Sequence, residues 1–91
     1  MKIKNCNEEM LKRLFELIAS IDNAKDISLL LGDLCTENEI EQMAQRIRAA
    51  ELLLEGKTYA QVKEECNISS ATLSRVSRCV QYGEGYRKFL K

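Results

Sequence analysis

Hydroxyl and guanidinium side chains recur over residues 70–78 at spacings that place them together on one side of a helix. This polar side carries Ser70, Thr72, Ser74, Arg75 and Arg78. No acidic residue occurs from Asn67 to Tyr82. Short polar side chains near a helix N-terminus can approach base edges closely, and arginine binds guanine or phosphate. The pattern therefore predicts a helix that reads DNA, and a solvated polar face without a ligand is the alternative.

Two short helices joined by a tight turn are expected to position these side chains. Thr58 and Gln61 form a capping box at the start of the first helix. Asn67 tolerates a left-handed backbone and is predicted to make the turn, after which Ser69 or Ser70 caps the second helix. The apolar residues of the pair are Tyr59, Val62, Cys66, Ile68, Leu73, Val76 and Val80. This is the arrangement of a helix-turn-helix.

The composition of the whole chain indicates a single all-α domain. The chain has 91 residues, 45% of them hydrophobic, with no proline and only four glycines. Its formal net charge is zero, but residues 1–56 hold seven basic and eleven acidic side chains, whereas residues 57–91 hold seven basic and three acidic. A basic C-terminal half suits double-stranded DNA as a partner, although four net charges also suit an ordinary solvated face.

The sequence offers little for other chemistry. It has no histidine, and its four cysteines, at positions 6, 35, 66 and 79, show no C-x-x-C spacing. Structural zinc and histidine-based catalysis are therefore not expected. No glycine-rich phosphate loop and no serine or cysteine with a base partner is apparent, so an enzyme is not expected. Without a signal peptide or a long apolar run, the chain is predicted to be cytoplasmic, with no membrane partner.

Further helices are predicted on both sides of the helix-turn-helix. Asn7 is expected to cap a helix that runs to about residue 21, and Asn23 a shorter one that ends near residue 34. A capping box of Thr36 and Glu39 opens a long central helix over residues 37–55, and Gly56 ends it. A short helix over residues 84–91, with Tyr86, Phe89 and Leu90, completes a set of about six.

The apolar faces of two helices are too wide for one chain of this size to bury. The first helix carries Met10, Leu11, Leu14, Phe15, Ile18 and Ile21. The central helix carries Ile40, Met43, Ala44, Ile47, Ala50, Leu53 and Leu54. A homodimer would cover both faces. Coiled-coil pairing of the first helix is the alternative, but its stripe provides few heptads.

The stretch from Leu34 to Leu90 resembles the tryptophan-repressor family. The resemblance rests on Thr36-Glu37-Asn38-Glu39, Gln45-Arg46-Ile47-Arg48, Glu51-Leu52-Leu53-Leu54-Glu55-Gly56 and Ser70-Ala71-Thr72-Leu73-Ser74-Arg75. It implies one domain over residues 1–91, with dimerisation helices in 1–34, the central helix in 36–55, the helix-turn-helix in 58–81 and the C-terminal helix in 84–91.

The resemblance also implies an intertwined homodimer that places two recognition helices, each about residues 70–81, in successive major grooves. Carried over residue by residue, it puts Ser70, Ala71, Thr72, Ser74 and Arg75 at the DNA and Lys63 on phosphate. A small-molecule corepressor would lie between the central and recognition helices. Arg46 and Arg75 would flank its ring, and Thr36 would lie near its polar end.

Two departures from the family's pattern concern this corepressor. Val76 follows Arg75, where the tryptophan binders have glycine, and the turn at Lys57-Thr58-Tyr59 is one residue shorter. A branched side chain would occupy the space of an indole edge, so L-tryptophan is predicted not to be the effector. Ordinary pairing with nearby glutamates could instead account for Arg46 or Arg48.

The function predicted from the sequence is a homodimeric, sequence-specific DNA-binding repressor of transcription, with an effector that the sequence does not identify. The alternative is a dimeric protein-interaction module whose helix-turn-helix no longer reads DNA.

Overall fold

The computed structural model describes residues 3–90, and these residues form six α-helices and no β-strand. The predicted all-α class with about six helices is confirmed. Contacts divide the chain into two compact units, Met1–Thr36 and Glu37–Lys91. The outer limits of the expected domain, residues 1 and 91, lie outside the described residues.

The first unit contains α1 (Glu8–Ala19) and α2 (Ala24–Leu34). Asn7 and Asn23 cap them as predicted, because each side chain accepts a hydrogen bond from the backbone N–H three residues later. The helix α1 ends two residues before the expected limit, since the Ser20 hydroxyl donates to the carbonyl of Leu17 and competes with the helical pattern. Several apolar side chains of this unit are exposed in the single chain, including Met10 at 59% and Leu29 at 67%.

The helix α3 (Glu37–Leu54) ends at a glycine in a left-handed conformation, as predicted for Gly56. The Gly56 N–H donates to the carbonyl of Leu53, and the Lys57 N–H donates to that of Leu52. This pair of bonds is a Schellman motif, which satisfies two carbonyls that the helix end would otherwise leave free. The chain therefore turns sharply into the next helix.

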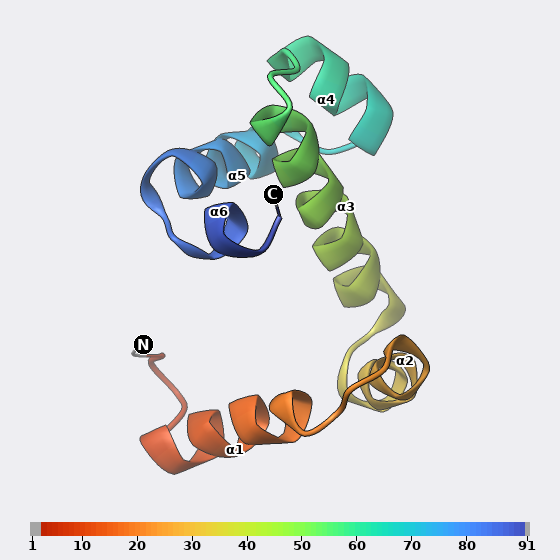
Figure 1. Cartoon of the computed structure of the whole chain (residues 1–91), viewed down its shortest axis with the longest axis vertical. Helices are drawn as coiled ribbons and strands as arrows, with labels where there is room; N and C mark the ends of the chain where they lie inside the picture. Colours follow the sequence, from red (N-terminus) through yellow and green to blue (C-terminus); the bar gives the residue numbers. More distant parts are fainter. Residues whose placement is uncertain (1–2, 91) are drawn as a thin grey trace. The chain divides into compact units, whose positions relative to one another are not determined.

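The second unit is built around the C-terminal half of α3. Figure 1 shows α4 (Tyr59–Cys66), α5 (Ser70–Tyr82) and α6 (Gly85–Phe89) gathered about it. The buried core consists of Ala49, Ala50, Leu52, Val62, Cys66, Ile68, Leu73 and Val76, with Leu53, Val80, Tyr86 and Leu90 packed against it. Burial of these side chains fixes α5 against α3 and α4, which sets the direction of the α5 polar side.

The joint between α5 and α6 is a close backbone approach. A Cβ atom at Gly83 would lie 2.7 Å from the carbonyl oxygen of Cys79, which no side chain tolerates without a shift. The Gly83 carbonyl accepts hydrogen bonds from both Nε and Nη2 of Arg87, at 3.2 and 3.1 Å. These two bonds link α6 to the residue that ends α5. Tyr86 and Leu90 pack against the core, whereas Phe89 is exposed.

Candidate nucleic-acid interface and effector pocket

Three predicted local motifs build the turn between α4 and α5. Thr58 and Gln61 form the capping box, with the Gln61 side chain accepting from the Thr58 N–H at 2.9 Å. Asn67 adopts the left-handed conformation, with φ 52° and ψ 48°, and its N–H donates to the Lys63 carbonyl. Of the two serines that could cap α5, Ser69 does so, because its hydroxyl accepts from the Thr72 N–H. The helix-turn-helix prediction is thus confirmed at the level of backbone geometry.

The α5 helix divides into a buried and an exposed side much as its sequence indicates. Leu73 and Val76 are buried. The side chains predicted to meet DNA are exposed at Ser70, Ala71, Ser74, Arg75 and Arg78, and half-buried at Thr72. Within residues 3–90, neither Arg75 nor Arg78 forms a salt bridge. Two uncompensated guanidinium groups therefore lie on the exposed side of a helix that contains no acidic residue.

Lys63, on α4, lies close to the start of α5. Its ammonium group donates a hydrogen bond to the Ser70 hydroxyl at 2.7 Å. The hydroxyl of Ser69, the residue that caps α5, donates a hydrogen bond to the Thr72 hydroxyl at 3.0 Å. The two helices thus bring a cation and three hydroxyl groups together at one end of α5.

Ser77 is a buried polar residue that the sequence analysis missed. It is 5% exposed, and the Tyr59 hydroxyl donates a hydrogen bond to its side-chain oxygen. Tyr59 was expected among the apolar residues of the pair, but it stays half-exposed and uses its hydroxyl to satisfy Ser77. Ser77 lies four residues after Leu73, which is the helical spacing that could have signalled its burial.

Arg46 and Arg48 differ in their surroundings. Arg48 forms salt bridges with Glu51, Glu55 and Glu65, the closest at 3.1 Å from Nε to the Glu65 carboxylate. Desolvation lowers the pKa of Arg48, but these carboxylates, Glu65 foremost, outweigh it and raise the pKa overall. Arg46 has no such pair within the described residues. The pairing interpretation therefore holds for Arg48 only.

A pocket of about 330 Å³ lies between α3 and α5, where the corepressor site was expected. Its lining residues are Met43, Arg46, Ile47, Arg75, Val76, Cys79 and Tyr86. The structure thus brings Arg46, Arg75 and Val76 together. Thr36 is not among the lining residues and belongs to the other unit. Cys79 and Tyr86 were missed, because only the packing of α6 against α5 brings Tyr86 to the pocket.

Val76 borders this pocket and is also part of the core. Only 1% of the residue is exposed, and it packs in the cluster that includes Leu73 and Ala50. One edge of the pocket is therefore formed by a side chain whose burial holds α5 in place. Cys66 belongs to the same cluster, and burial, followed by the charge of Glu65, raises the pKa of its thiol.

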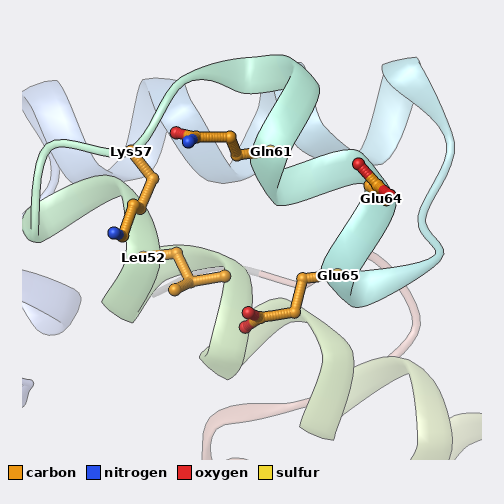
Figure 2. A pocket seen from close by; sticks show the side chains of 5 residues that line it. All are labelled: Leu52, Lys57, Gln61, Glu64 and Glu65. Atoms are coloured by element: carbon orange, nitrogen blue, oxygen red, sulfur yellow. The ribbon is translucent and has the colours of Figure 1, made fainter.

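A second hollow, of about 360 Å³, lies between the end of α3 and the helix α4. Its lining residues are Leu52, Lys57, Gln61, Glu64 and Glu65. Figure 2 shows the Lys57 side chain and the Glu65 carboxylate on opposite sides of Leu52. Glu65 is paired with Arg48, and the Gln61 side chain takes part in the helix cap, so two of the polar side chains here already have structural partners.

The described residues offer neither a metal site nor a membrane span. No three or more of the His, Cys, Asp and Glu side chains in this range are grouped so that they could hold a metal ion. None of the six helices combines the length and the apolarity that crossing a membrane requires.

Comparisons with known proteins agree on one family. The model of the family described as "Trp repressor protein" matches residues 9–91. The chain is 41% identical over 83 residues to "Uncharacterized protein YerC" of Bacillus subtilis (strain 168), covering 91% of this chain and 80% of that one. It is also similar to a crystal structure described as "a putative Trp repressor from Staphylococcus aureus". That similarity has a TM-score of 0.90 and 36% identity, and covers 99% of this chain and 91% of the other.

Proposed function

Because this chain belongs to the Trp repressor family, whose members are regulators and not enzymes, we propose that it is a sequence-specific DNA-binding repressor of transcription. In this proposal the chain acts as a homodimer, and each protomer inserts α5 into the major groove of double-stranded DNA. Residues 1–34 supply dimerisation helices, residues 36–55 the central helix, residues 58–81 the helix-turn-helix and residues 84–91 the C-terminal helix.

The observation that carries the proposal is the exposed side of α5. Arg75 and Arg78 are exposed and have no acidic partner within residues 3–90. Phosphate contacts from such side chains provide most of the affinity for DNA, while groups at the helix N-terminus touch bases. We assign base contacts to Ser70, Ala71, Thr72 and Ser74, a phosphate contact to Lys63, and phosphate or guanine contacts to Arg75 and Arg78.

Exposed apolar side chains support the homodimer. Met10, Phe15 and Ile18 lie at helical spacing on α1, and all three are exposed in the single chain. An exposed apolar stripe of this kind usually marks a surface that another chain covers. A two-fold dimer would also supply the pair of recognition helices that an operator with two half-sites requires.

A gel-shift experiment at two salt concentrations tests the DNA-binding function. Genomic fragments are first selected on the immobilised protein, and the affinity for a selected fragment is compared with that for random DNA at about 50 mM and 200 mM salt. Contacts to several phosphates should produce a steep loss of affinity with salt. Equal, weak binding to both DNAs would favour the alternative function, a dimeric protein-interaction module.

A matched pair of variants assigns the binding to α5. Arg78→Gln should weaken binding to every DNA sequence, since it removes an exposed cation from the proposed interface. Arg13→Gln removes the same charge from the side of α1 opposite its apolar stripe and should leave the affinity unchanged. If the two variants bind DNA equally well, α5 is not the DNA-binding element.

A further inference from the structure

We infer that Tyr59 and Ser77 are positioning residues: the hydrogen bond between them fixes the angle between α4 and α5 and thereby sets how sharply α5 discriminates between DNA sequences. The inference rests on the proposed DNA-binding function. It assigns part of the sequence specificity to two residues outside the set that is proposed to touch DNA.

A directed polar contact lies within the apolar packing of α5. Ser77 is the only buried polar residue among residues 3–90, with 5% of it exposed. The Tyr59 hydroxyl donates a hydrogen bond to its side-chain oxygen. On the same helix, Leu73 and Val76 belong to the apolar core. Apolar contacts have no preferred direction, whereas a hydrogen bond weakens steeply as its angle closes, so this bond defines an orientation that the core alone does not.

The bond joins the two helices far from the turn between them. Tyr59 is the first residue of α4, which ends at Cys66 just before the turn. Ser77 comes seven residues after Ser70, the first residue of α5. At the helical rise per residue, Ser77 therefore lies about 10 Å along α5 from the turn. The turn and the bond are two separate attachments, and together they fix an angle that the turn alone would leave free to hinge.

A small change in this angle would affect base contacts more than phosphate contacts. A displacement of about 1 Å at Ser77 tilts α5 by roughly 6° about the turn. The short side chains of Thr72 and Ser74 cannot extend to restore a hydrogen bond to a base edge. The long, flexible side chains of Lys63 and Arg78 can still reach a phosphate. Discrimination between sequences should therefore fall, while the sequence-independent affinity should stay.

The same pair contributes little to the stability of the fold. Phenylalanine and alanine would fill nearly the same space as Tyr59 and Ser77 and would leave no polar group to satisfy. Replacement of both partners of a hydrogen bond by apolar groups of similar shape is often nearly neutral for stability. Stability and discrimination can therefore be separated by experiment.

The variants Tyr59→Phe, Ser77→Ala and the double variant test the inference. Fluorescence anisotropy measures the ratio of the dissociation constants for random and selected DNA, at a temperature where circular dichroism shows each variant folded. In all three variants this ratio should fall by about fivefold or more, the lower end of what a lost base contact costs. The loss should be the same in all three, because each removes the same bond. The affinity for random DNA and its salt dependence should not change.

The melting midpoint of the double variant should lie within a few degrees of that of the wild type. A double variant that keeps the wild-type ratio would overturn the inference. So would an equal loss of affinity for random and selected DNA, because that is the effect of a smaller folded fraction.

Cys66→Ala is the matched control. It truncates a buried side chain of α4 and should lower the melting midpoint, but it leaves the bond between Tyr59 and Ser77 in place. It should keep the wild-type ratio. If Cys66→Ala lowers the ratio as much as Tyr59→Phe does, discrimination follows stability and the pair has no positioning role.

A measurement without DNA separates the inference from the proposed function. In NMR spectra of the free protein, Tyr59→Phe should shift the amide signals of residues 70–72, which lie more than one helical turn from Ser77. Unchanged signals there would overturn the inference while the wild type still discriminates between DNA sequences. If the wild type itself binds selected and random DNA equally, the proposed function is wrong, and the role of the pair in discrimination is wrong with it.

Discussion

The Lys63 ammonium group donates a hydrogen bond to the Ser70 hydroxyl at 2.7 Å, across the turn that joins α4 to α5. The two residues are seven positions apart and belong to different helices. Both are members of the proposed DNA-binding set, one assigned to phosphate and the other to bases. The cation that we propose to bind phosphate therefore already lies beside the first residue of α5 in the free protein.

Lys63→Ala should weaken binding to all DNA sequences by a similar factor. The variant removes one phosphate contact, so the slope of log affinity against log salt should become shallower by about one unit per site. Anisotropy titrations on a selected and a random fragment at four salt concentrations measure both effects. A loss of affinity confined to the selected fragment would assign Lys63 to base reading instead.

Thr72→Ala should relax the sequence preference without a change in the salt slope. Thr72 is in the first turn of α5, half-buried, and its hydroxyl lies 3.0 Å from that of the capping Ser69. Loss of a base contact typically costs about 1–3 kcal/mol of discrimination against the wrong base. Selection of bound fragments from a random library, followed by sequencing, reports the preference. An unchanged preference would exclude Thr72 from base contacts.

Asn67→Ala should destabilise the fold through the backbone alone. Asn67 is exposed and has a positive φ of 52°, where a residue with a plain Cβ costs about 1–2 kcal/mol. Such a loss lowers the melting midpoint of a domain of this size by several degrees. Asn67→Gly is the matched control and should lose less, because glycine tolerates this conformation. Equal midpoints for Asn67→Ala and the wild type would contradict the prediction.

The melting midpoint of the wild type should rise with protein concentration, because the folded state is predicted to be a dimer. Phe15→Glu places a charge on the exposed apolar stripe of α1 and should lower the midpoint at a fixed concentration. Arg13→Glu, on the opposite side of α1, should leave it nearly unchanged. Analytical ultracentrifugation that finds a folded monomer at micromolar concentration would refute the dimer.

L-tryptophan should not bind in the micromolar range. Val76 is 1% exposed, so its methyl groups cannot move aside without disturbing the core, and overpacking of this kind costs about 1–3 kcal/mol. That corresponds to roughly a five- to 150-fold loss of affinity. Isothermal titration calorimetry of the wild type measures it, and tight binding would refute the prediction. Val76→Gly should bind L-tryptophan more tightly than the wild type does. Val76→Ala is the control, because it leaves a smaller cavity and because alanine is a better helix former than glycine.

Local signals made much of the fold predictable from the sequence. The caps at Asn7, Asn23 and Thr58 and the left-handed Asn67 each depend on residues within three or four positions, and the structure confirms all of them. The burial of Leu73 and Val76 followed from helical spacing in the same way.

Features that depend on contacts between distant segments were not predictable. The bond between Tyr59 and Ser77 joins residues 18 positions apart, and neither residue type signals it. Tyr86 reaches the pocket through the packing of α6, and the difference between Arg46 and Arg48 depends on the position of Glu65 on α4. The roles of the pocket and of the α5 side chains stay predictions.

The close approach at Gly83 has a consequence for mutational scans of this protein. A side chain at Gly83 would collide with the Cys79 carbonyl oxygen. The backbone shift that relieves this collision would displace the Gly83 carbonyl, which accepts two hydrogen bonds from Arg87, and would therefore disturb α6. A saturation screen for repression should therefore score almost every replacement of Gly83 as inactive, although a glycine has no side chain with which to bind base or effector. Intolerance to substitution at this position reports steric fit of the backbone, and it should not be used to map the regulatory site.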